Sequence, residues 1–97
     1  HPDEVAKAID SINGVESSAV ISLSNSENEN YLVAYVKNKK NINLKPKDIN
    51  QSLLLKLPSY MIPNKYNFVE YLPLNQSGKI DTKKLKEDSK CSLKKRF

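Results

Sequence analysis

Apolar residues near the N-terminus recur at the spacing of an amphipathic helix. They are three or four positions apart and so share one helical face: Val5, Ala8, Ile9 and Ile12. Pro2 suits the first position of a helix, and Gly14 readily adopts the left-handed conformation that ends many helices. The pattern therefore predicts a first helix between Pro2 and Gly14, with its apolar face packed on the rest of the domain.

The next two apolar stretches have the character of β-strands. Residues 15–24 place Ala19, Ile21 and Leu23 on one face of an extended segment. Residues 31–37 (YLVAYVK) form an unbroken run rich in β-branched and aromatic side chains, which is typical of a central strand with neighbours on both sides. Because a short polar stretch joins the two segments, we expect an antiparallel hairpin.

A second amphipathic pattern runs from residue 45 to residue 57. Ile49, Leu53 and Leu57 recur every four residues, and Leu54 is expected to widen their apolar stripe. Proline is tolerated in the first turn of a helix but not in its interior. Pro46 and Pro58 therefore predict where this helix begins and ends.

The rest of the chain predicts one more strand and one more helix. Prolines at 58, 63 and 73 divide the segment into short extended pieces; Tyr66 to Val69 is the best candidate strand, and Tyr60 and Met61 are expected to pack beneath the loop. Asp81 has the character of a helix cap before a basic helix at 82–90. The predicted fold class is α+β, a small mixed or antiparallel sheet of about three strands covered by about three helices.

Length and charge narrow the possible functions. The chain has 97 residues, which indicates one small domain over residues 1–88 followed by a basic flexible tail over 89–97, and leaves no room for a two-domain enzyme. The net charge of +5 is concentrated toward the C-terminus. A single cysteine excludes an internal disulfide, and no apolar run is long enough to span a bilayer. These features lead us to expect a cytoplasmic protein without a membrane partner.

The segment LPLNQSGKID carries the most distinctive candidate chemistry. Gln76, Ser77 and Gly78 form a polar turn that displays Lys79. A lysine in such a turn either is simply solvated or meets a carboxylate or phosphate. Asp81 is interpreted as a helix cap rather than as a catalytic acid. The acidic pair Asp3 and Glu4 suits the first turn of a helix, and no metal site is predicted.

This segment also carries a resemblance to a known family. LPSYMIPNKYNFVEYLPLNQSGKIDTKKL resembles the C-terminal end of the adenylation domains of nonribosomal peptide synthetases, within the superfamily of AMP-binding, acyl-adenylate-forming enzymes. HPDEVAKAIDSINGVESSAVI and YLVAYV resemble the segments that precede it in that family. Asp81 after GKI is closer to peptide synthetases and D-alanine carrier ligases than to acyl-CoA synthetases.

The resemblance implies a role as the small lobe of a ligase. In that family the lysine at the position of Lys79 contacts the substrate carboxylate and ATP during adenylation, and the lobe then rotates for thioester formation. The implied cofactors are ATP and Mg²⁺, bound mainly by a large N-terminal domain, with phosphopantetheine on the acceptor. The implied partners are that large domain, a peptidyl or acyl carrier protein and a small carboxylic acid substrate. The lobe alone is expected to be inactive.

A second interpretation remains open from the sequence. The basic C-terminal residues would also suit a stand-alone binding module for a carrier protein or for nucleic acid. Nucleic acid is the less favoured partner, because the chain has neither an RNA-recognition aromatic motif nor zinc-ligand spacing.

Overall fold

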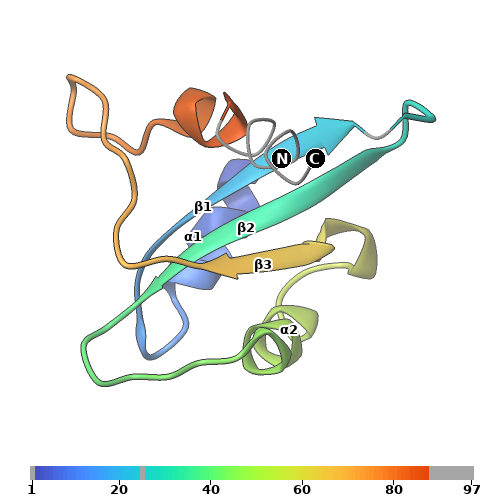
Figure 1. The fold of residues 1–97 in the computed structure, drawn as a ribbon. Helices are drawn as coiled ribbons and strands as arrows, with labels where there is room; N and C mark the ends of the chain where they lie inside the picture. The colour runs from blue at the N-terminus through green and yellow to red at the C-terminus, as the bar shows by residue number, and fades with distance from the viewer. Residues whose placement is uncertain (1, 25, 88–97) are drawn as a thin grey trace, which may run out of the picture.

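A computed structural model describes residues 2–24 and 26–87 of the chain. The elements follow one another as helix α1 (Pro2–Asp10), strand β1 (Val15–Ser24), strand β2 (Asn30–Asn38), helix α2 (Pro46–Leu54), the 3₁₀ turn η1 (Ser59–Met61) and strand β3 (Lys65–Phe68) (Figure 1). Residues 82–87 form a further short helical segment. This is the small α+β domain that the hydrophobic pattern predicts. In the described part of the chain, no helix is long and apolar enough to cross a membrane.

The sheet is mixed, with the strand order β1-β2-β3. Strands β1 and β2 form the predicted antiparallel hairpin, in which Val20 lies opposite Ala34. Strand β3 lies on the other side of β2 and runs parallel to it, with Tyr66 also opposite Ala34. Parallel neighbours need a crossover connection, and the chain between β2 and β3, which contains α2, provides it. β2 is thus the central strand, as its continuous apolar sequence predicts.

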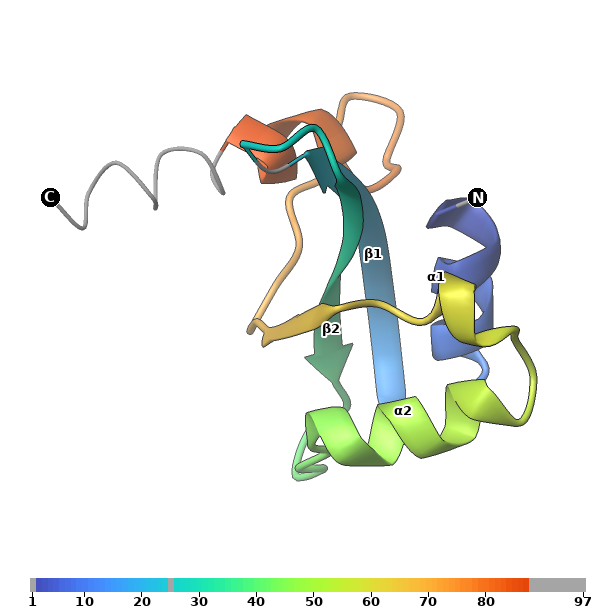
Figure 2. The ribbon, with the colours of Figure 1, turned by 90° about the vertical axis from the view of Figure 1, so that its right-hand side faces the viewer.

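One face of the sheet is covered by α1 and α2 (Figure 2). Val5 and Ile9 from α1 and Ile49 and Leu53 from α2 are fully buried there. They pack against strand residues of the same face, which are Val20, Ala34 and Val36. The predicted apolar stripes of both helices therefore meet in one core cluster.

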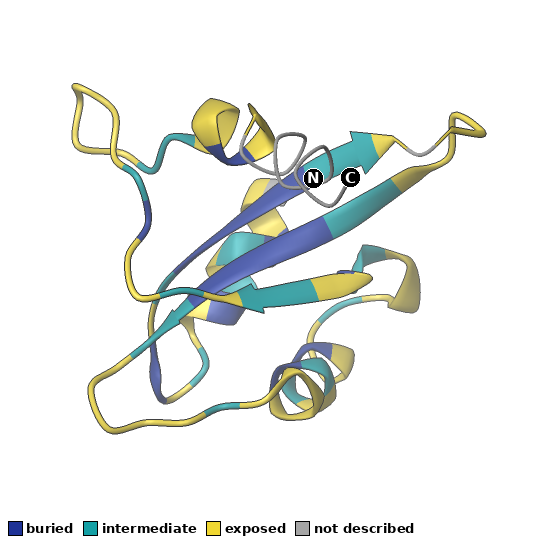
Figure 3. Ribbon diagram, viewed as in Figure 1, coloured by how far each residue is buried: buried dark blue, intermediate teal, exposed yellow. Residues whose placement is uncertain are grey.

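The opposite face of the sheet is covered by the chain that follows β3. Leu72 and Leu85 from this segment pack against a second set of strand side chains: Ala19, Ile21, Val33 and Tyr35. Successive strand residues point to opposite faces, so β1 and β2 contribute to both cores. The middle of each of these strands is accordingly buried (Figure 3). This second core fixes the path of residues 69–87 over the sheet.

Helix α2 is shorter than its sequence pattern predicts. It ends at Leu54 rather than at Leu57, with Leu55 as its C-cap, and the backbone N–H groups of Lys56 and Leu57 both donate to the Leu53 carbonyl. Leu54 is 58% exposed, so the prediction that it widens the apolar stripe is wrong. One residue step in an α-helix is a rotation of about 100°, which turns Leu54 away from the face that buries Leu53.

The first two tyrosines that follow α2, Tyr60 and Tyr66, differ in how far they are buried. Tyr60 is 83% exposed, and the expectation that it packs beneath the loop is therefore wrong, whereas Met61 does pack against the core. Tyr66 on β3 is partly buried, and its hydroxyl donates to Oδ1 of Asn50 on α2 at 2.5 Å. Burial raises the pKa of Tyr66 to about 12. This hydrogen bond ties the crossover helix to the sheet.

Candidate functional site

The chain leaves the sheet after β3 and forms a small hairpin that projects from the domain (Figure 1). The backbone N–H of Val69 still donates to the Val36 carbonyl at 2.9 Å, and Leu72 is buried in the second core. Beyond it, Leu74 pairs with Ile80 in an antiparallel bridge. Residues 74–79 are all exposed (Figure 3). We call residues 74–80 the lysine hairpin, because Lys79 lies within it.

The turn of the lysine hairpin is closed by backbone hydrogen bonds between its two sides. The N–H of Asn75 donates to the Lys79 carbonyl at 2.7 Å, and the N–H of Gly78 donates to the Asn75 carbonyl at 3.0 Å. Gly78 has a φ of +83°, as the sequence leads us to expect. A β-turn followed by a left-handed residue is the usual form of a three-residue hairpin loop. Gln76, Ser77 and Gly78 form that loop, and Lys79 follows directly.

The side chain of Asn75 organises the same turn from inside. Its Oδ1 accepts the backbone N–H of Ser77 at 2.9 Å and that of Lys79 at 3.1 Å. The sequence reasoning did not identify Asn75, although asparagine is known to bond the backbone two residues ahead in turns. An asparagine three residues before a glycine in a polar stretch was the available signal.

The base of the hairpin is anchored to the domain by Asp81. Its backbone N–H donates to the Pro73 carbonyl at 2.8 Å, and its Oδ1 accepts the N–H of Lys84 at 3.0 Å. The second bond is that of an N-capping aspartate, so the interpretation of Asp81 as a helix cap is confirmed. The capped segment carries Leu85 into the second core. Buried Leu72 and Leu85 therefore hold the hairpin in place from both ends.

The structure brings the four predicted site residues together in one exposed loop. Gln76, Ser77, Gly78 and Lys79 are consecutive and exposed. No carboxylate in the part of the chain that the structure describes forms an ion pair with Lys79. An ammonium group displayed in this way is available to an anion on another molecule or domain.

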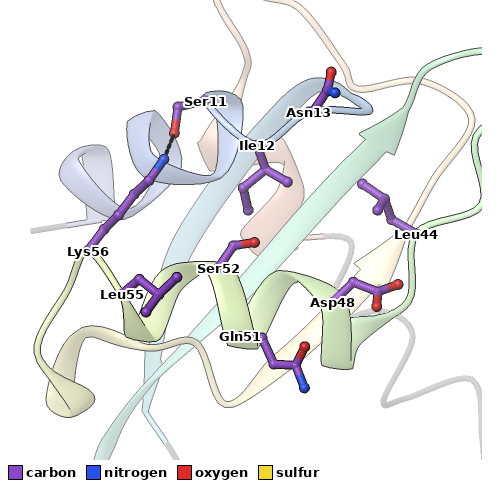
Figure 4. Close-up of a pocket in the computed structure, with 9 residues that line it drawn as sticks. All are labelled: Ser11, Ile12, Asn13, Leu44, Asp48, Gln51, Ser52, Leu55 and Lys56. Carbon is purple, nitrogen blue, oxygen red and sulfur yellow. Dashed lines mark hydrogen bonds between the residues drawn. The ribbon is translucent and has the colours of Figure 1, made fainter.

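A separate hollow of about 640 Å³ lies between the turn after α1 and helix α2 (Figure 4). Lys56 reaches across it and donates from Nζ to the Ser11 hydroxyl at 2.5 Å. None of the residues lining this hollow belongs to the lysine hairpin. The domain therefore does not enclose Lys79 in this cavity.

The described residues contain no cluster of metal-ligating side chains. No group of three histidine, cysteine, aspartate or glutamate side chains within residues 2–24 and 26–87 is arranged to hold an ion. Asp3 and Glu4 are exposed in the first turn of α1. The predicted basic tail over 89–97 and the proposed domain boundary at residue 88 lie outside the described residues.

Comparisons with known proteins place this geometry in context. Residues 4–79 match the sequence model of a family described as the AMP-binding enzyme C-terminal domain, and the match extends to Lys79. Bacitracin synthase 1 of Bacillus licheniformis is 36% identical over 84 residues, which is 87% of this chain and 2% of the synthase. The D-alanine–D-alanyl carrier protein ligase of Staphylococcus aureus (strain Newman) is 51% identical over 41 residues, which is 42% of this chain and 8% of that ligase.

Solved structures share the same fold. A fatty acyl CoA synthetase of Mycobacterium tuberculosis superposes with a TM-score of 0.84 at 28% identity, over 95% of this chain and 18% of the synthetase. ATP-bound MatB of Rhodopseudomonas palustris gives a TM-score of 0.83 at 28% identity, over 91% of this chain and 18% of that protein. In each comparison the chain corresponds to a small part of a much longer protein.

Proposed function

The chain belongs to the family of AMP-binding enzyme C-terminal domains, and from this membership we propose that it is the small lobe of a ligase that activates a carboxylic acid with ATP. The observation that carries the proposal is Lys79, an exposed lysine on a hairpin fixed to the core at both ends. The substrate class is an amino acid or another small carboxylic acid. The similarity to bacitracin synthase 1 and to a D-alanyl carrier ligase supports this class.

The proposed role of Lys79 is to bridge two anions while they react. Adenylation brings a substrate carboxylate against the α-phosphate of ATP, and the two groups repel each other. A cation about 4 Å from an anionic oxygen contributes roughly 4 kcal/mol at an effective dielectric constant of 20. If this contribution grows as charge develops in the transition state, it accelerates the step. Lys79 needs no proton transfer for this task.

Lys79 would complete a site that is built mainly by another domain. Lys79 belongs to neither core cluster of this lobe and is exposed, so the residues that enclose the substrate would come from the large N-terminal domain. We propose that ATP and Mg²⁺ are held mainly there. When the lobe closes, the lysine hairpin would enter that site and help to exclude water.

The same exposed placement is compatible with a second step. We propose that the lobe rotates after adenylation, withdraws the lysine hairpin and presents another face for thioester formation on the phosphopantetheine of a carrier protein. Leu72 and Leu85 of the second core anchor the hairpin, and Ile80 packs against the same cluster, so the hairpin should move with the lobe as one body. The lobe by itself is expected to be inactive.

Substitution of Lys79 tests the role directly. In the intact ligase, Lys79→Ala should lower substrate-dependent ATP–pyrophosphate exchange by about 10²–10³-fold, which is the usual effect of removing one transition-state contact. Thioester formation from supplied acyl-adenylate should survive. Lys83→Ala removes another exposed lysine from the neighbouring helical segment and should leave both steps unchanged. Normal exchange by the Lys79 variant would refute the proposed role.

A further inference from the structure

We propose that Asn75 is a positioning residue for Lys79 in the adenylation step. This inference rests on the proposed function, because it assigns to Asn75 the task of holding the backbone from which the lysine side chain extends. Asn75 does not itself need to touch the substrate.

The hydrogen bonds of Asn75 fix Lys79 on both sides of its α-carbon. Oδ1 of Asn75 accepts the N–H of Lys79 at 3.1 Å, and the N–H of Asn75 donates to the Lys79 carbonyl at 2.7 Å. Oδ1 also accepts the N–H of Ser77 at 2.9 Å, and the Asn75 carbonyl accepts the N–H of Gly78 at 3.0 Å. Asn75 thus forms hydrogen bonds with three of the four residues that follow it in the chain: Ser77, Gly78 and Lys79.

The side chain and the backbone of Asn75 make separable contributions. Replacement by alanine leaves the two backbone hydrogen bonds possible but removes the acceptor for Ser77 and Lys79. Ser77 and Lys79 are both exposed residues, so we expect water to replace the lost acceptor and the hairpin to keep its general path. What is lost is the constraint that selects one conformation of the loop.

Loss of that constraint matters because the lysine must reach a fixed point in another domain. A displacement of about 1 Å at a reacting group costs on the order of 100-fold in rate. The lysine side chain is long and flexible, so the position of its ammonium group depends on how firmly the backbone of Lys79 is held. Oδ1 of Asn75 is the side-chain atom that holds it.

A role limited to the stability of the domain would predict a different result. Asn75 is exposed and belongs to neither core cluster. Substitution should therefore leave the unfolding midpoint of the chain almost unchanged. Asn64 offers a matched control, because it is also exposed and its Oδ1 also accepts a backbone N–H, that of Leu32 at 3.2 Å.

The test compares Asn75→Ala, Asn75→Ser and Asn64→Ala in the intact ligase. Asn75→Ala should lower kcat for pyrophosphate exchange by about 10–100-fold, with little change in KM, and should spare thioester formation from supplied acyl-adenylate. Asn75→Ser should recover part of the loss, because a serine hydroxyl makes the same turn contact more weakly. Asn64→Ala should behave like the unmodified enzyme.

A double substitution separates this inference from the proposed function. If Asn75 acts through Lys79, adding Asn75→Ala to Lys79→Ala should cause no further loss. A large loss with Lys79→Ala but an unchanged kcat with Asn75→Ala would overturn the role of Asn75 and leave that of Lys79 intact. Normal exchange by Lys79→Ala would overturn both.

A measurement without catalysis checks the structural step. In the 97-residue chain, Asn75→Ala should accelerate amide hydrogen exchange at Ser77 and Lys79, while Asn64→Ala should leave those two amides unchanged. Unaltered exchange at both amides in Asn75→Ala would contradict the inference whatever the activity of the ligase.

Discussion

Gly14 joins α1 to β1 in a conformation that an L-amino acid adopts only at a cost, and Gly14→Ala is expected to destabilise the domain. Its φ is +103°, and its carbonyl accepts the N–H of Lys39 at 2.8 Å, so the turn is tied to the end of β2. A Cβ at this position would lie 2.8 Å from Cγ2 of Ile42 and 3.3 Å from Cδ1 of Leu44. Alanine would therefore add both backbone strain and crowding.

The magnitude follows from three contributions. The left-handed conformation costs an alanine about 1–2 kcal/mol relative to glycine. Crowding adds about 1 kcal/mol or slightly more, since Ile42 is 43% exposed and has room to move. The reduced entropy of the unfolded chain offsets about 0.4–1 kcal/mol. The free energy of unfolding should therefore fall by about 1–3 kcal/mol. Each kcal/mol should lower Tm by roughly 4–8 °C for a domain of this size.

The second glycine of the chain provides the matched control. Gly78 also has a positive φ, but a Cβ there meets no atom within 4 Å. Gly78 lies in an exposed hairpin outside both cores. Gly78→Ala should therefore lower the free energy of unfolding by at least about 1 kcal/mol less than Gly14→Ala does. Urea or thermal unfolding of the two variants measures the difference.

A double-mutant cycle isolates the crowding contribution. Ile42→Ala removes the atom that the new Cβ would meet, so Gly14→Ala should be less destabilising by about 1 kcal/mol in that background. The reasoning is refuted if Gly14→Ala costs no more than Gly78→Ala, or if the cycle shows no coupling between positions 14 and 42.

Two further predictions concern the core and the crossover. Leu53→Ala should lower the free energy of unfolding by about 2–5 kcal/mol, because Leu53 is fully buried. Leu55 is 89% exposed, so Leu55→Ala should change the free energy of unfolding by no more than about 0.5 kcal/mol. Denaturant unfolding measures both variants. Burial raises the pKa of Tyr66 to about 12, so between pH 10 and 12 the unfolded chain ionises this hydroxyl while the folded domain keeps it protonated, and stability should fall as the pH rises. Tyr66→Phe should remove the share of this loss of stability that Tyr66 causes, whereas Tyr71→Phe, at a position 76% exposed, should not. Equal stability profiles between pH 10 and 12 for the two variants would contradict the role given to Tyr66.

The elements that sequence reasoning located correctly are those defined by local patterns. Helix α1, the β1–β2 hairpin and the central position of β2 follow from periodicity, turn residues and continuous apolar sequence. The exposed turn before Lys79 was also predictable, because glycine and polar residues favour such turns. The family resemblance then gave Lys79 a proposed role that the spacing of residues alone left open.

The errors arose where long-range contacts decide the outcome. Leu54 and Tyr60 are apolar or aromatic by sequence, yet both are exposed, whereas their neighbours Leu53 and Met61 pack in or against the first core cluster. Asn75 was missed because its importance depends on which backbone groups the folded turn brings to its side chain.

The sequence by itself determined the α+β class, the order of the helices and strands, and the presence of a lysine in an exposed turn, since each depends on residues close together in the chain. Only the tertiary structure decided that β3 runs parallel to β2 and that residues 69–87 cover the second face of the sheet. It also decided that Leu72 and Leu85 anchor the lysine hairpin. These features depend on burying apolar surface between segments far apart in the sequence, a contribution that no local pattern specifies.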